Sequence, residues 1–276
     1  MGEIMVFPSR YFLIVLAALL MLGSGLPRPA IAGPNPVQMG IVLMHGKGGA
    51  PTRLVADLAA SLESRGWLVA NLEMPWSGRR DYDVEVGAAE REVETALQGL
   101  REKGAQKLFV AGHSQGGVFA LYFGGRHVLD GVIAIAPGGN VGNPLFREKL
   151  GDTIASARQL VAEGKGDEKA RLADYEGAKG TYPVITTPAI YLTWFDPAGA
   201  MNQTLAVQHM KPQVPVLYVA PRNDYPGLLK IKLQMFGALP ANPQTQLYEP
   251  DASHVGAPSA SIQAIVDWAT AVANAP

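Results

Sequence analysis

The stretch Leu-Phe-Val-Ala-Gly-His-Ser-Gln-Gly-Gly, residues 108–117, decides how the rest of this sequence is interpreted. It begins as a short apolar run and ends in Gly112-x-Ser114-x-Gly116, after which residues 118–128 have a helix-like pattern. The two glycines leave room for a very tight strand-to-helix turn, because a Cβ at either position would collide with the adjoining strand or helix. Such a turn is a nucleophile elbow, which holds the serine Oγ exposed at the end of a strand.

The position of Ser114 at a helix start also favours a chemical role. The free N–H groups and partial positive charge of a helix N-terminus suit a developing oxyanion. A five-residue G-x-S-x-G match also occurs by chance, so the surrounding sequence has to decide whether Ser114 is catalytic.

The composition limits which proteins and sites need to be considered. A chain of 276 residues, 48% of them hydrophobic, can form one large or two small α/β domains with a sizeable core. Its net charge of −1 does not indicate binding to nucleic acid or to an anionic membrane surface. The sequence has no cysteine, which excludes disulfides, thiolate metal sites and a cysteine nucleophile.

The N-terminus has the pattern of a secretory signal peptide. Arg10 precedes an apolar run over residues 11–22, and Ala30-Ile-Ala32 supplies small residues for cleavage. The run is short for a transmembrane helix, which needs about 20 apolar residues. We predict that residues 1–32 are a cleaved signal peptide and that the protein is periplasmic or secreted. An uncleaved membrane anchor is the alternative.

Apolar runs alternate with helix-like segments along the rest of the chain, which predicts a mainly parallel, twisted sheet flanked by helices. Strands buried on both faces of such a sheet are continuous apolar runs. We expect strands at residues 39–44, 67–72, 131–136, 214–220 and 246–249 and in the run that enters Gly112. We expect helices at residues 52–65, 84–103, 118–128, 227–237 and 259–274.

Residues 141–212 depart from this alternation. We expect helices over residues 145–162 and 168–179, followed by a mixed apolar segment over residues 181–195. At about 70 residues, this segment is far longer than an ordinary crossover between strands. We therefore predict a helical, cap-like insert over the strand ends, within a single domain of residues 33–276.

Polar residues that follow the strands are the site candidates, because ligands of such sheets bind beyond the carboxyl ends of the strands. Four strand ends carry them: the loop His45-Gly-Lys-Gly-Gly49, Ser114, Asp224 and His254. Glycine loop, serine, acid and histidine follow one another in this order in the α/β-hydrolase fold. From residue 39 onward the sequence resembles that superfamily, and within it the serine esterase and dienelactone-hydrolase-like members.

The resemblance implies that His254 is the general base for Ser114, whose hydroxyl is a weak nucleophile at neutral pH. His254 lies in the loop of residues 249–258, where the family places its histidine. The other histidines have structural interpretations: His45 packs against or orients the glycine loop, His113 faces away from the nucleophile, His127 is far from the sheet edge, and His209 is on the surface of the insert.

The resemblance also implies that Asp224 orients the imidazole and stabilises the imidazolium. Asp224 follows the strand of residues 214–220, but Pro221 stands where the family usually has a glycine. The rival acids are Asp196, in the insert, and Asp251, close to the histidine along one loop. A surface aspartate in a turn is the non-catalytic alternative.

Two backbone N–H groups should then form the oxyanion hole, those of Gln115 and Lys47. The glycines around Lys47 allow the backbone to approach a substrate, although a plain strand-to-helix turn would also explain them.

Trp76, Arg79 and Trp194 are candidate substrate contacts. Arginine suits bidentate binding of a carboxylate, so Arg79 could hold an acidic substrate group. A solvated loop, or an ion pair with a neighbouring aspartate, is the alternative for Arg79. The two tryptophans could line a pocket for the acyl or alcohol group, or they could belong to the core of the insert.

The sequence has no H-E-x-x-H motif, no P-loop and no dinucleotide-binding fingerprint, so we expect neither a metal nor a cofactor. The resemblance implies a serine hydrolase that cleaves a small carboxylic ester through an acyl-enzyme. A peptidase, lactonase or thioesterase on the same fold is an alternative, because the fold does not fix the chemistry. A non-catalytic binding protein that keeps the fold is another.

Overall fold

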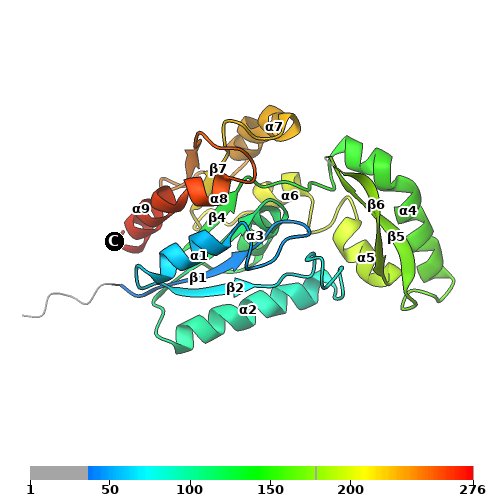
Figure 1. Ribbon diagram of the computed structural model, residues 1–276, viewed down its shortest axis with the longest axis horizontal. Coiled ribbons are helices and arrows are strands. Elements are labelled where there is room, and N and C mark those ends of the chain that lie inside the picture. The colour runs from blue at the N-terminus through cyan, green and yellow to red at the C-terminus, as the bar shows by residue number, and fades with distance from the viewer. Residues whose placement is uncertain (1–36, 178, 276) are drawn as a thin grey trace, which may run out of the picture. The chain divides into compact units, whose positions relative to one another are not determined.

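Six parallel strands form the central sheet of the chain, which the computed structural model describes over residues 37–177 and 179–275 (Figure 1). The strand order is β2-β1-β3-β4-β7-β8, and every neighbouring pair is parallel. The strands are β1 Met39–Met44, β2 Leu68–Leu72, β3 Lys107–His113, β4 Gly131–Ile135, β7 Val216–Val219 and β8 Gln246–Tyr248. The predicted parallel α/β fold is confirmed.

Helices cover both faces of this sheet: α1 Ala56–Glu63, α2 Val86–Glu102, α3 Gln115–Arg126, α7 Pro226–Gly237, α8 Ala257–Ala260 and α9 Ile262–Ala273. Side chains alternate along each strand, so β1 contributes to two separate cores. Ile41 and Leu43 pack in the cluster that holds α1 and α9, and Val42 and Met44 pack in the cluster that holds α2 and α3. Figure 1 shows α1 and α2 on opposite sides of the sheet. Burial on both faces explains why the strands are uninterrupted apolar runs.

The insert between β4 and β7 contains α4 Pro144–Ala162, β5 Ala170–Glu176, β6 Gly180–Thr186, α5 Pro188–Phe195 and α6 Gln203–Gln208. Figure 1 shows α4, α5 and the β5–β6 pair grouped together at the right of the view. Buried side chains of α4, β5 and α5 belong to the same apolar cluster as α2 and α3, so the insert shares a core with the sheet.

The helix predicted over residues 168–179 is wrong, because this segment contains strand β5, which pairs antiparallel with β6. Burial alternates along β5, with Leu172 and Asp174 buried and Arg171 exposed. The chain reverses before Gly180, whose φ of 74° is accessible to glycine at no steric cost. Helix-favouring lysine, glutamate and alanine residues misled the prediction, since strand pairing overrides local propensity.

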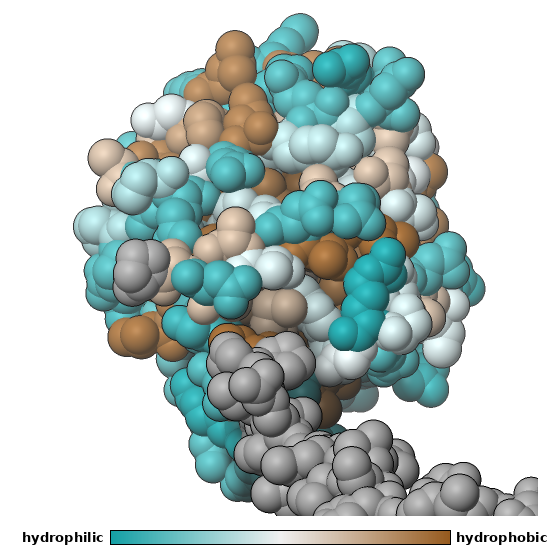
Figure 2. All heavy atoms as spheres, turned by 90° about the vertical axis from the view of Figure 1, so that its left-hand side faces the viewer, coloured by the Kyte–Doolittle hydropathy of each residue, from teal (hydrophilic) through white to brown (hydrophobic). Residues whose placement is uncertain are grey.

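The predicted signal peptide and its cleavage site lie outside the described residues. Within residues 37–177 and 179–275, no helix combines the length and apolar character needed to cross a membrane. Figure 2 shows the face that lies at the left of Figure 1, where polar and apolar side chains are interspersed.

Candidate active site

Ser114 lies in the tight turn between β3 and α3, with φ of 54° and ψ of −118°. A positive φ is unusual for serine, and such strain is concentrated at functional sites. Both flanking glycines are required by close contacts. A Cβ on Gly112 would lie 2.0 Å from the Gly116 carbonyl oxygen, and one on Gly116 would lie 2.7 Å from the carbonyl oxygens of Met44 and His45. The turn thus has the geometry of a nucleophile elbow.

Asp224 and His254 contact each other through a hydrogen bond of 2.7 Å between Asp224 Oδ1 and His254 Nδ1. Both residues are buried. A carboxylate accepts hydrogen bonds only, so Nδ1 carries the proton and leaves the Nε2 lone pair free. The rival acids have other partners, since Asp196 pairs with Arg158 and Asp251 accepts from the Asn223 side chain.

The loops after β7 and β8 run side by side, which brings Asp224 and His254 together. Ala220 N donates to Tyr248 O at 2.8 Å, and Arg222 N donates to Pro250 O at 2.9 Å. Pro221 lies between these two donors, at a position where the pairing of the loops requires no backbone N–H. Proline is tolerated at such a position, so its departure from the family pattern leaves this pairing intact.

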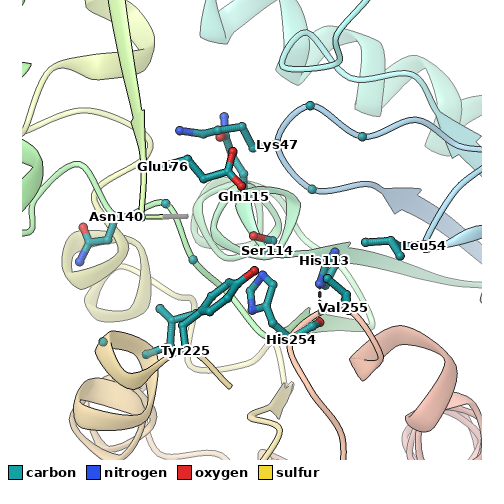
Figure 3. Close-up of a pocket in the computed structure, with 18 of the residues that line it drawn as sticks. Lys47, Leu54, His113, Ser114, Gln115, Asn140, Glu176, Tyr225, His254 and Val255 are labelled. Carbon is teal, nitrogen blue, oxygen red and sulfur yellow. Dashed lines mark hydrogen bonds between the residues drawn. The ribbon is translucent and has the colours of Figure 1, made fainter. Parts of the chain in front are cut away.

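Ser114 and His254 line the same cavity, which has a volume of about 1060 Å³. Figure 3 shows Tyr225 and His254 around the part of the cavity that holds Ser114. The Tyr225 ring lies 4.6 Å from the His254 ring, centroid to centroid. The structure describes both side chains, and it shows no hydrogen bond between Ser114 and His254. Catalytic hydrogen bonds are often long without substrate, so the geometry is compatible with a nucleophile and its base.

His113, which we expected to face away from the nucleophile, contacts the histidine loop and lines the same cavity as Ser114. Its Nε2 donates to the His254 carbonyl oxygen at 2.9 Å, and the two rings lie 4.9 Å apart (Figure 3). His113 Nδ1 is buried and has no hydrogen-bond partner among the described residues. Burial, aided by the neighbouring His254, lowers the pKa of the His113 imidazole to about 4. His113 is therefore neutral near pH 7.

The glycine loop after β1 is held in place by the segment that follows β2. Gly48 N donates to Trp76 O at 2.8 Å, and Trp76 Nε1 donates to His45 O at 2.8 Å. Met74 N donates to His45 Nε2 at 3.0 Å, so His45 Nδ1 donates to Gly46 O at 2.7 Å. Burial lowers the pKa of the His45 imidazole, which favours this neutral form. His45 orients the loop, as its sequence position indicated.

The backbone N–H groups of Lys47 and Gln115 have no hydrogen-bond acceptor in the part of the chain that the structure describes. Both residues line the cavity beside Ser114. In Figure 3 they lie above Ser114, on the opposite side from His254. Two free backbone N–H groups next to a serine at a helix start are able to donate hydrogen bonds to an oxyanion.

Apolar side chains line part of the cavity, beside charged ones such as Glu176 and Lys179. Leu54, Leu145, Tyr225 and Val255 line it and are each 43% to 50% exposed. From α7, Leu228 approaches closely enough that a Cβ on Gly138, next to Ser114 Oγ, would lie 3.2 Å from its methyl group. Sequence reasoning missed these residues, although Tyr225 directly follows the predicted acid.

The structure does not place Trp76, Arg79 or Trp194 in the cavity lining. Both tryptophans are buried in the core with their rings 5.7 Å apart, and Trp194 Nε1 donates to Val84 O at 2.7 Å. The Arg79 side chain is 80% exposed and pairs with Glu73. The tryptophan N–H groups are satisfied by backbone carbonyls, so both rings act as core side chains.

Over the described residues, no group of three or more histidine, aspartate or glutamate side chains is arranged to hold a metal ion.

Comparisons with known proteins agree with this geometry. A sequence model described as the alpha/beta hydrolase family matches residues 41–268. No curated protein matches the chain. The chain is similar in structure to a metagenome-derived lipolytic enzyme, with a TM-score of 0.58, 18% identity, and coverage of 86% of this chain and 94% of that one.

Two further solved structures are similar to the chain. One is a monoacylglycerol lipase from Paleococcus ferrophilus, with a TM-score of 0.58, 19% identity, and coverage of 84% of this chain and 94% of that one. The other is a monoglyceride lipase from Saccharomyces cerevisiae, with a TM-score of 0.58, 17% identity, and coverage of 87% and 89%. At these identities the likeness shows a shared fold.

Proposed function

Since this chain belongs to the alpha/beta hydrolase family and is a hydrolase, we propose that it cleaves a carboxylic ester through Ser114, His254 and Asp224. The observation that carries this proposal is the hydrogen bond of 2.7 Å between Asp224 and His254, because His254 lines the same cavity as Ser114, a serine with a positive φ. A serine, a histidine and an acid that follow three separate strands are the groups that acyl transfer by this route uses, which supports the proposal.

The reaction begins when His254 Nε2 takes the proton of the Ser114 hydroxyl and Oγ attacks the ester carbonyl. The carbonyl oxygen becomes an oxyanion, which the Lys47 and Gln115 amides stabilise. His254 then gives the proton to the leaving alcohol as the C–O bond breaks. Water, deprotonated by the same imidazole, attacks the acyl-enzyme, and the carboxylic acid leaves as Ser114 recovers its proton. Asp224 keeps the imidazole in the productive tautomer throughout.

The cavity supports an ester with an apolar part as the substrate. Its rim carries exposed Leu54, Leu145 and Val255, and burying such side chains against an alkyl group is favourable by about 25 cal/mol per Å². Two of the similar structures are described as lipases that act on monoglycerides. A lactone, thioester or amide would use the same groups, so a substrate panel should include them.

Ser114→Ala tests the proposal. It should lower kcat for p-nitrophenyl esters by about 10⁴-fold or more while leaving the unfolding temperature within a few degrees. Ser64→Ala, at the surface end of α1, is the matched control and should keep full activity. A fluorophosphonate probe should label the wild-type protein and not the Ser114 variant. Unchanged ester turnover in Ser114→Ala would refute the proposal.

The same proposal includes export before the enzyme acts, which rests on the signal-like pattern of residues 1–32. N-terminal sequencing of the protein from its native host should then begin at Gly33. Recovery of a chain that begins at Met1 would contradict export with cleavage.

A further inference from the structure

Asp174 is a completely buried carboxylate in β5 of the insert, outside the proposed catalytic groups. It accepts hydrogen bonds from Lys47 Nζ at 2.6 Å, Tyr182 OH at 2.9 Å and Tyr82 OH at 3.1 Å. The adjacent Tyr175 N donates at 2.6 Å. A charged group that has left water completely is thus surrounded by four donors, as a buried carboxylate requires.

Two of these donors, Lys47 and Tyr82, connect Asp174 to the two residues with free backbone N–H groups beside Ser114. Lys47 is one of those residues. It lines the cavity, and its ammonium donates to Asp174. Tyr82 leads to the other, because Gln115 Nε2 donates to Tyr82 OH at 3.2 Å. A tyrosine hydroxyl has a single proton, and a carboxylate can only accept. Tyr82 therefore donates to Asp174 and accepts from Gln115.

The surroundings keep this arrangement fixed. The Lys47 side chain is only 10% exposed, and its ammonium lies 5.4 Å from the Phe146 ring centroid. Burial, reinforced by the charge of Asp174, raises the pKa of the Tyr82 hydroxyl well above its usual value, so Tyr82 remains a donor. The Tyr82 ring also packs at 5.0 Å against the Phe195 ring.

Stability alone explains such a group poorly. Taking two charges out of water costs several kcal/mol per ion, and apolar side chains of similar volume often stabilise a fold as well or better. What a buried ion pair provides instead is a unique position for the groups that it joins. Here the ion pair joins Lys47 of the glycine loop to Asp174 of β5, and Asp174 is linked to Gln115 through Tyr82.

We propose that Asp174 is a positioning residue that fixes the Lys47 and Gln115 amides in the geometry of the oxyanion hole. The insert would then act on the rate of the reaction and not only on substrate selection. This inference rests on the proposed function, in which these two amides stabilise the oxyanion.

The size of the effect follows from how oxyanion holes respond to misplacement. Complete loss of one donor lowers kcat by about 100- to 1000-fold. Asp174→Asn removes the charge without removing the backbone donors, so we expect kcat to fall by roughly 10- to 100-fold, with KM changed less than about 3-fold.

Three variants separate positioning from packing. Asp174→Asn removes the charge that holds Lys47. Tyr82→Phe keeps the ring but breaks the link to Gln115. Tyr191→Phe is the matched control, because Tyr191 OH donates to the Ala173 carbonyl next to Asp174 and to no group of this network. The assay is kcat and KM for p-nitrophenyl acetate, with active sites counted by a fluorophosphonate.

The second readout is the inhibition constant of a trifluoromethyl ketone, which forms a tetrahedral oxyanion adduct with an active-site serine. It should rise in parallel with the loss of kcat/KM in Asp174→Asn and Tyr82→Phe, and stay within about 2-fold in Tyr191→Phe. A merely structural role would lower the count of active sites or the unfolding temperature and leave this constant unchanged. If Asp174→Asn does not fold, Tyr82→Phe decides alone.

Two outcomes would overturn the inference, and they differ. In the first outcome, Asp174→Asn and Tyr82→Phe fold and have the wild-type kcat and inhibition constant, while Ser114→Ala is inactive. This result would refute the role of Asp174 and leave the proposed function standing. Absence of both ester hydrolysis and Ser114 labelling in the wild-type protein would overturn the proposed function and this inference together.

Discussion

Replacing His113 with glutamine should make the folded protein less sensitive to mild acid. The His113 imidazole is only 2% exposed, and it donates through Nε2 to the backbone of His254. Burial lowers the pKa of His113 from 6.5 to about 4. The folded protein therefore resists taking up a proton at a site where the unfolded chain accepts one readily.

The direction and size of the effect follow from these two pKa values. The unfolded chain becomes protonated as the pH falls through about 6.5, and the folded protein only near pH 4. The stabilising contribution of neutral His113 is thus fully present above pH 6.5 and is lost as the pH falls toward 4. One pKa unit corresponds to about 1.4 kcal/mol, so this group alone lowers the free energy of unfolding by about 2 kcal/mol between pH 7 and pH 5.

Glutamine is the informative substitution, because its side-chain amide can still donate to the His254 carbonyl but does not titrate. Urea unfolding at pH 7 and pH 5 gives the loss of stability for each protein. The loss should be about 2 kcal/mol smaller in His113→Gln than in the wild-type protein, because the other titrating groups contribute equally to both.

His209→Gln is the control, since His209 is exposed and should lose as much stability as the wild-type protein. Equal losses in wild-type and His113→Gln, within about 0.5 kcal/mol, would refute the assignment of His113 as a buried neutral imidazole.

Asp224→Asn should lower kcat for p-nitrophenyl esters by roughly 10³- to 10⁴-fold, because an amide opposite His254 Nδ1 favours the wrong imidazole tautomer. Circular dichroism should show the fold intact, and retention of more than a tenth of the wild-type kcat would contradict a role for Asp224. Arg79→Ala should leave kcat/KM unchanged and alter the free energy of unfolding by less than about 0.5 kcal/mol, because the Arg79 side chain that pairs with Glu73 is 80% exposed. A substantial rise in KM would restore Arg79 as a substrate contact.

The sheet could be predicted from the sequence because its signal is local. Strands β1 and β4 are covered on both faces, so nearly every side chain is apolar and each run stands out. The elbow is equally local, since Gly112, Ser114 and Gly116 lie within five residues and each has a steric reason. Strand ends then bring distant polar residues to one edge, which makes Asp224 and His254 candidate site residues.

Other features depend on contacts that no local pattern records. His113 and His254 are 141 positions apart, and Lys47 and Asp174 are 127 apart. A buried aspartate in the middle of β5 also breaks the apolar pattern that marks a strand, so the segment that contains β5 is predicted as a helix. Trp194 illustrates the same limit, because only the fold shows that a backbone carbonyl accepts from its ring.

The ion pair between Lys47 and Asp174 has a consequence for exchanging parts between related enzymes. A graft that replaced the insert with one lacking an equivalent carboxylate would leave the Lys47 ammonium buried without a counterion. Removing one partner of such a pair costs about 3–5 kcal/mol. Chimeras would therefore need to transfer Lys47 and Tyr82 together with the β5–β6 hairpin that carries Asp174. During evolution, a substitution at one of these three residues should favour compensating substitutions at the other two.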